Sequence, residues 1–119
     1  MSENVYWVLE LAVRPDRLDD FRGLMREMVA AAASEPGTLN YEWNISSDGT
    51  ACHIYVRYEN PAAVMLHMAS FGTQFDSRFA ALAQITRMVV YGAPNAEVKA
   101  ALAPYGAVYF APLGGFARP

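Results

Sequence analysis

The chain has a single cysteine, Cys52, among 119 residues. One thiol cannot form an internal disulfide, so the sequence is not that of a small secreted domain held by disulfides. Charged residues are also scarce, at 18%, while hydrophobic residues reach 54%, which excludes a disordered chain and allows a buried core. Nine basic residues against twelve acidic ones form no basic cluster, so we expect no nucleic-acid partner.

No segment has the pattern of a signal peptide or a transmembrane helix. Residues 1–4 (MSEN) carry no basic charge ahead of an apolar stretch. The longest uncharged run, 100–117, is long enough to cross a membrane, but two prolines and three glycines interrupt it. We therefore expect a cytoplasmic protein with no membrane partner.

Motifs for metals and nucleotide cofactors are missing as well. The two histidines and the cysteine show no ligand spacing, and Cys52 and His53 are neighbours on a predicted strand, so their side chains point to opposite faces. There is no G-x-G-x-x-G or Walker pattern. We expect no metal and no cofactor, although FMN and haem leave no short motif by which this test excludes them.

The hydrophobic pattern predicts six main elements in one domain, 1–119. They are strands over 6–13, 39–46, 52–58 and 85–91, a helix over 16–33 that Asp16 can cap, and a second helix that begins at Asn60-Pro61. Gly72 allows a break in the second helix, and a further turn or two carries Phe75, Phe79 and Leu82. The order strand, helix, strand, strand, helix, strand is that of an α+β, ferredoxin-like split βαβ fold.

Residues 92–119 extend beyond this core of 6–91. Asn95 is a suitable cap for a short helix through Leu102, and 108–110 is a candidate short strand. We expect this extension to cover the mouth of a cavity or to reach across to a partner.

One face of the predicted sheet has no helix to cover it. By strand alternation this face carries Glu10, Asn40, Glu42, Asn44, His53, Tyr55, Arg57 and Arg87, with Tyr6, Ala12 and Val89 among them. Mixed charged and aromatic side chains suit a second sheet, so we expect a homodimer formed sheet to sheet. The alternative is an ordinary solvent-exposed face.

The helix-facing side of the sheet holds the candidate site. Tyr41, Trp43 and Tyr58 point toward the helices, and His67 shares a helix face with Phe71. With methionines from both helices as an apolar wall, such a cavity suits a flat aromatic ligand, and His67 could take a proton from a phenol or an enol. The alternative is plain packing, because a histidine on an apolar helix face is more often a core or capping residue.

Three short motifs resemble those of the antibiotic biosynthesis monooxygenase family. Residues 35–43 (EPGTLNYEW) resemble its E-x-G-x-x-x-Y passage into the second strand, and 58–67 (YENPAAVMLH) resemble its W-E-x-x-x-A-x-x-x-H passage, with Tyr58 in place of the tryptophan. Residues 13–16 (VRPD) resemble its x-R-P-G turn. The resemblance implies a ferredoxin-like protomer that dimerises through its sheets into an α/β barrel.

The resemblance also implies several activities, because some members oxidise phenols or quinols without a cofactor, some cleave haem and one branch isomerises a small phosphorylated molecule. Haem-degrading relatives use an asparagine, a tryptophan and an axial histidine. Leu11 and Tyr58 stand at the first two positions here and no histidine follows Gly72, which argues against haem. Many relatives also carry a second histidine shortly after the first, and Gly72 stands at about that position here.

We therefore interpret the chain as a cofactor-independent monooxygenase that oxidises a small phenolic or quinol substrate with molecular oxygen. His67, with Tyr41 or Tyr58, would remove the proton of the ring hydroxyl. Tyr58 would hydrogen-bond a carbonyl, and Trp43 and Phe71 would contact the ring. One alternative is a non-enzymatic dimeric module that binds a small molecule. Another is a cofactor-free isomerase, for which a phosphorylated substrate would need a cationic pocket.

Overall fold

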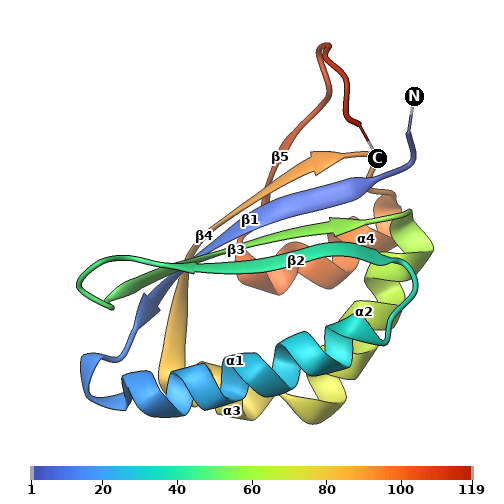
Figure 1. Ribbon diagram of the computed structural model, residues 1–119. Helices are drawn as coiled ribbons and strands as arrows, with labels where there is room; N and C mark the ends of the chain where they lie inside the picture. The colour runs from blue at the N-terminus through green and yellow to red at the C-terminus, as the bar shows by residue number, and fades with distance from the viewer. Residues whose placement is uncertain (1, 119) are drawn as a thin grey trace.

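The computed structural model describes residues 2–118, which form one mixed sheet with helices on one of its faces (Figure 1). The strands are β1 (Val5–Val13), β2 (Thr38–Ile45), β3 (Ala51–Tyr58), β4 (Ala83–Gly92) and β5 (Val108–Phe110). The helices are α1 (Leu18–Ala33), α2 (Pro61–Gln74), α3 (Asp76–Leu82) and α4 (Ala96–Leu102), with short 3-10 turns η1 (Pro15–Arg17) and η2 (Ala103–Tyr105). The predicted α+β, ferredoxin-like fold is confirmed.

The strand order is β2-β3-β1-β4-β5. The first four strands pair antiparallel, and β5 adds a fifth, parallel strand at the edge beside β4. The pairing shifts once between β1 and β4, after Glu10, and this irregularity is the only interruption in that ladder. The extension beyond residue 92 thus includes the short helix and the short strand that the sequence predicts, and both pack onto the core.

Two local predictions about the helices are wrong. Asp16 does not cap α1, because Pro15 begins a 3-10 turn that contains Asp16, and α1 begins only at Leu18. Gly72 does not break α2. Nothing packs where its side chain would be, and the helix continues to Gln74, with Phe75 N donating to Phe71 O at 2.9 Å across that glycine.

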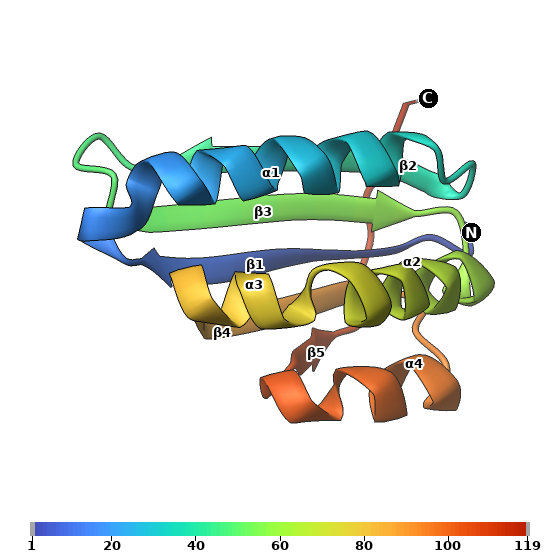
Figure 2. The same cartoon turned by 90° about the horizontal axis from the view of Figure 1, so that it is seen from below.

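The helices cover the sheet face that carries the alternate residues Val5, Trp7, Leu9 and Leu11 of β1. Figure 2 shows α1 lying along the β2 and β3 side and α2 and α3 running nearly end to end beside it, with α4 next to β5. Buried residues form two clusters, one under α1 and α3 and the other under α2 and α4. Their burial is the main source of stability in a domain of this size.

The opposite face of the sheet is not covered by helices. Cross-strand pairing places its side chains in three rows: Asn40, Arg57, Tyr6, Tyr91 and Phe110; Glu42, Tyr55, Val8, Val89 and Val108; and Asn44, His53, Glu10 and Arg87. The predicted polar residues therefore do share this face. Toward β4 and β5, however, the first two rows become apolar, and the Tyr6 and Tyr91 rings stack with centroids 5.4 Å apart.

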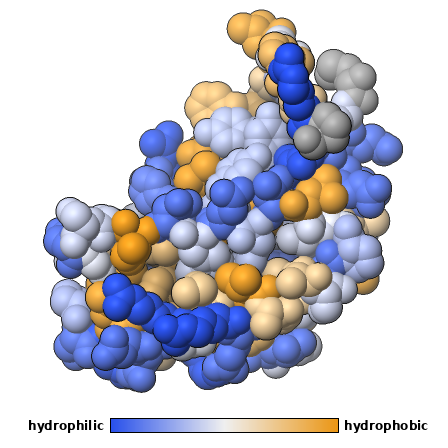
Figure 3. Space-filling model, viewed as in Figure 1, coloured by the Kyte–Doolittle hydropathy of each residue, from blue (hydrophilic) through white to orange (hydrophobic). Residues whose placement is uncertain are grey.

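The chain after β5 projects away from the body on the uncovered side of the sheet (Figure 1). Its Leu113 and Phe116 side chains are exposed to solvent. Figure 3, in the same orientation, shows hydrophobic residues at the tip of this projecting segment. Exposed apolar side chains on an uncovered face are typical of a surface that meets a partner.

Candidate functional site

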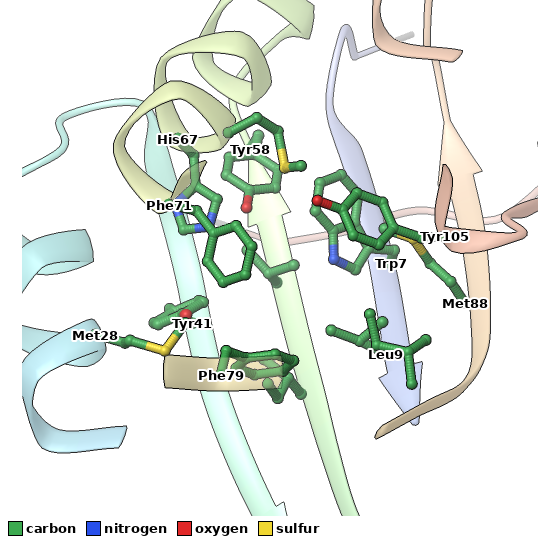
Figure 4. A pocket seen from close by; sticks show the side chains of 14 residues that line it. Trp7, Leu9, Met28, Tyr41, Tyr58, His67, Phe71, Phe79, Met88 and Tyr105 are labelled. Atoms are coloured by element: carbon green, nitrogen blue, oxygen red, sulfur yellow. The ribbon is translucent and has the colours of Figure 1, made fainter. Parts of the chain in front are cut away.

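A cavity of about 50 Å³ lies between the sheet and the helices. Its walls come from β1, β2, β3 and β4, from α1, α2 and α3, and from the η2 turn (Figure 4). The lining residues are Trp7, Leu9, Met28, Tyr41, Ile54, Val56, Tyr58, His67, Met68, Phe71, Phe79, Ile85, Met88 and Tyr105. A mostly apolar wall with a few convergent polar groups is typical of a small-molecule site.

The most distinctive polar feature beside this cavity is a close contact between His67 on α2, which lines the cavity, and Glu35, which lies behind the histidine and does not line it. His67 Nδ1 lies 2.9 Å from Glu35 Oε1, and the two side chains are only 12% and 18% exposed. Thr38 Oγ1 donates to the same carboxylate oxygen at 2.7 Å, which fixes its position. Because a carboxylate only accepts hydrogen bonds, the proton lies on Nδ1, and the lone pair of a neutral His67 is then on Nε2.

The sequence between α1 and β2 explains why Glu35 reaches this histidine. The chain turns at Pro36 and Gly37, and a Cβ on Gly37 would lie only 2.5 Å from the Cβ of Ala63 on α2. Only glycine permits so close an approach of the turn to the helix. Glu59 N then donates to Gly37 O at 2.8 Å, which ties the turn to the end of β3.

Two phenols flank the histidine, one from the fully buried Tyr58 and one from the partly buried Tyr41. The ring centroids of Tyr58 and Tyr41 lie 5.3 Å and 5.5 Å from that of His67. Burial raises the pKa of Tyr58 well above its usual value, and the neighbouring Tyr41 and Glu35 raise it further. Burial also raises the pKa of Tyr41, although the nearby Trp43 indole opposes the rise. Both phenols therefore stay protonated near neutral pH and act as hydrogen-bond donors rather than as bases.

The Tyr58 hydroxyl has no hydrogen-bond partner among the described residues, although it is fully buried. A buried hydroxyl without a partner costs about 1–3 kcal/mol of stability. Figure 4 shows it pointing into the cavity, on the same side as the His67 ring. An unpartnered donor of this kind, aimed into a hollow, is what a ligand oxygen would satisfy.

The structure brings four of the five predicted site residues together. His67, Tyr58, Tyr41 and Phe71 line the cavity, but Trp43 does not. Trp43 lies two residues further along β2, where Phe21 of α1 and Phe79 of α3 pack against it, and it lines a separate hollow of about 100 Å³. Its indole N–H lies near Tyr41 and makes no hydrogen bond to any described residue.

Sequence reasoning missed three residues of the site. Glu35 was identified from the sequence only as the first residue of the motif 35–43. The separation of Glu35 and His67 along the chain does not predict that the two side chains are in contact. Trp7 lies on the helix-facing side of β1 by simple alternation, and it could have been found that way. Tyr105 comes from the extension, and nothing in its local sequence places it against the cavity.

Other possible sites are less well built. A groove of about 330 Å³ that Glu35 also lines is larger than the cavity, but its walls are a mixture of small apolar and polar residues without any aromatic side chain. Within residues 2–118, no three acidic, histidine or cysteine side chains lie together as metal ligands. No helix in that part of the chain is long and apolar enough to cross a membrane.

Comparison with known families places this cavity in context. The model of the antibiotic biosynthesis monooxygenase family matches residues 4–84. The chain belongs to this family. The match includes Glu35, Tyr41, Tyr58 and His67, and it ends before the segment that contributes Tyr105. Among curated proteins, none matches the chain.

Solved structures of the same fold differ in how much of the chain they cover. MupZ from Pseudomonas fluorescens is 21% identical and covers all of this chain and 92% of its own, with a TM-score of 0.89. Rv0793 from Mycobacterium tuberculosis is 24% identical and covers 73% of this chain and 91% of its own, with a TM-score of 0.63. A variant of SnoaB, a cofactor-independent oxygenase from Streptomyces nogalater, is 16% identical and covers 79% of this chain and 96% of its own, with a TM-score of 0.66.

The three structures differ in whether they cover the whole of this chain. Rv0793 and SnoaB are matched over nearly their whole lengths but leave about a quarter of this chain uncovered. MupZ covers the chain completely, so its fold accommodates the additional residues as well. The family model ends at residue 84, so the wall that Tyr105 forms lies outside the part of the chain that the model matches.

Proposed function

We propose that this protein is a cofactor-independent monooxygenase that oxidises a small phenolic or quinol substrate with molecular oxygen. The observation that carries the proposal is the 2.9 Å contact between His67 and Glu35 at the wall of an apolar cavity. Family membership and the fold shared with an oxygenase support it. The cavity would hold the ring, and the His67–Glu35 pair would remove its hydroxyl proton.

The chemistry needs a base, a donor and a dry site. His67 Nε2 takes the proton of the ring hydroxyl, and Glu35 stabilises the imidazolium that forms. The electron-rich phenolate reduces O₂ and bonds to it at a ring carbon. Loss of water from this peroxide leaves a new carbonyl, so one oxygen atom enters the product and the other leaves as water. Tyr58, kept protonated by burial, donates to the substrate oxygen as its charge changes.

The lining also indicates the charge of the substrate. Among the described residues that surround the cavity there is no lysine and no arginine. A phosphate or carboxylate buried there would have no cation to compensate for its lost hydration. A neutral ring is therefore favoured over the phosphorylated substrate that an isomerase of this fold would require.

The cavity must enlarge to admit a ring. Its 50 Å³ exceeds what a water molecule needs but is about a third of the roughly 150 Å³ that holds benzene in an engineered protein cavity. Met28, Met68 and Met88 line it, and methionine is the apolar side chain that adapts most easily. Rearrangement of these three side chains is the simplest way to make the necessary room.

We propose in addition that a second copy of the chain covers the uncovered sheet face. On this face, the first two of the three rows become apolar toward β4 and β5. The same face carries charges of both signs, Glu10 with Arg87 and Glu42 with Arg57. Such a surface is self-complementary across a two-fold axis. Light scattering coupled to gel filtration should give twice the chain mass of 13.1 kDa, and a monomeric mass at micromolar concentration would contradict the dimer.

Labelled oxygen tests the enzymatic proposal. With 1,4-hydroquinone as the probe and ¹⁸O₂ as the oxidant, the protein should form a hydroxyquinone that contains one labelled atom, faster than buffer alone. His67→Ala should lower this rate by about 10²-fold or more, because the base is lost. His53→Ala, which removes the other histidine from the opposite face, should leave it unchanged.

Each outcome has a clear meaning. A parental rate in His67→Ala would show that another group removes the proton. Formation of unlabelled quinone with hydrogen peroxide would indicate an oxidase rather than a monooxygenase. No product above the buffer rate with hydroquinone or larger quinols would contradict the proposed function.

A further inference from the structure

Among residues 2–118, Tyr105 is the one polar cavity residue that comes from outside the part matched by the family model. It is half-buried in the η2 turn and lines the cavity. In Figure 4 its hydroxyl points toward the cavity from the wall opposite to His67 and Tyr58. No hydrogen bond to a described residue occupies it, and loss of hydration raises its pKa, so it too stays a donor.

The chain holds Tyr105 from both sides. Before it, the Asn95 side chain caps α4 by accepting from Val98 N at 2.9 Å, and Val98 and Leu102 are fully buried against α2 and the sheet. After it, Gly106 turns the chain with a positive φ of 68°, and β5 pairs with β4. The backbone at Tyr105 is thus anchored by a docked helix and a paired strand, and its ring packs against the buried cluster under α2 and α4, so it is carried on a rigid part of the fold, as a precise binding group requires.

We propose that Tyr105 is a specificity-determining residue that selects rings carrying two oxygens on opposite edges. One oxygen lies between His67 and Tyr58, and the other accepts a hydrogen bond from Tyr105 across the cavity. A para-dihydroxylated ring fits this arrangement, whereas a simple phenol leaves Tyr105 without a partner. The inference rests on the proposed function only in using the same cavity, because it concerns binding and not turnover.

Anaerobic binding measurements test this inference without any oxidation. The probes are 1,4-hydroquinone and phenol, which differ by one hydroxyl, and quenching of tryptophan fluorescence reports binding because Trp7 lines the cavity. The parent should bind hydroquinone about tenfold more tightly than phenol, since one buried hydrogen bond separates them. Tyr105→Phe should weaken hydroquinone binding about tenfold and leave phenol binding unchanged.

Tyr109→Phe is the matched control, because it removes the other phenol of the same extension, which does not line the cavity. It should bind both probes as the parent does. Tyr105→Phe that still prefers hydroquinone, or a parent that binds the two probes equally or not at all, would overturn the inference. Preferential binding of hydroquinone without ¹⁸O incorporation would instead contradict the monooxygenase proposal and leave the role of Tyr105 intact.

Discussion

The chain's two histidines each lie beside a glutamate, on opposite faces of the same sheet. His67 Nδ1 is 2.9 Å from Glu35, and both side chains are largely buried. His53 Nε2 is 3.8 Å from Glu10, and those side chains are 54% and 31% exposed. The first pair is fixed by a third group, Thr38, whereas Glu10 is shared loosely with Arg87 at 4.0 Å.

The difference between the pairs comes from their surroundings rather than from their chemistry. An exposed ion pair is screened by water and holds its members in many geometries, so it contributes little. A largely buried, hydrogen-bonded pair such as His67 and Glu35 is held more tightly, and its electrostatic interactions are stronger because the walls around it are apolar. The helix-covered face can therefore position a base, whereas the uncovered face provides complementary charge for a partner surface.

The largest expected effect separates these two pairs directly. Glu35→Gln should lower kcat for hydroquinone oxidation by about 10²-fold with little change in KM, because an amide can donate to Nδ1 and move the imidazole proton to Nε2, where the base is needed. Steady-state rates of formation of the labelled product measure this.

The matched change on the other face is Glu10→Gln. It keeps the size of the side chain and removes the charge beside His53, and it should leave kcat and KM as in the parent. Equal losses in both variants would mean that the charge of the protein, and not the orientation of His67, sets the rate. An unaltered kcat in Glu35→Gln would remove Glu35 from the mechanism.

Strand alternation was sufficient to predict which residues share each face. It placed Tyr41 and Tyr58 under the helices and Arg57 and Glu42 on the other side, because a period of two is a property of the extended backbone itself. The fold class followed from the order of the elements. Where the sequence failed, the cause was local geometry: Pro15 began a turn early, and Gly72 was tolerated inside α2.

Strand alternation could not predict which residues of the helix-facing side reach the cavity. Alternation puts Trp43 and Tyr41 on one face, but only the packing of Phe21 and Phe79 against Trp43 separates it from the cavity that Tyr41 lines. The Glu35 and Tyr105 contacts depend on a turn and on a docked extension. Both are long-range features of the chain that hydrophobic periodicity does not encode.

A smaller effect should appear when the pH is raised. Burial raises the pKa of the Cys52 thiol from 9.0 to about 11, and it raises the pKa values of Tyr41 and Tyr58 on the same side of the sheet. Between pH 9 and 11 the unfolded chain has lost the Cys52 proton while the folded chain keeps it, so the free energy of unfolding falls as the pH rises. Below pH 9 this contribution is constant.

Urea unfolding at pH 8 and pH 11 measures the loss. The rise in the Cys52 pKa from 9.0 to about 11 corresponds to a contribution on the order of 2 kcal/mol. The free energy of unfolding should therefore differ between pH 8 and pH 11 by about that much less in Cys52→Ala than in the parent. Tyr55→Phe, on the uncovered face, should shrink it less. A difference that is the same in the parent and in Cys52→Ala would show that the thiol already ionises in the folded protein.

The smallest expected change runs in the opposite direction, because it should make the protein more stable. Tyr58→Phe removes the buried hydroxyl that has no partner and keeps the ring that packs against Trp7 and His67. The free energy of unfolding at pH 7 should rise by about 1 kcal/mol, since an unsatisfied polar group is deleted without leaving a cavity. The same variant should bind hydroquinone and phenol more weakly, because both use this donor. Stability gained together with binding lost would mark Tyr58 as a group retained for a ligand. A variant that is less stable than the parent would instead mean that water already satisfies the hydroxyl, and the comparison of the two faces would then have to treat the cavity as wet.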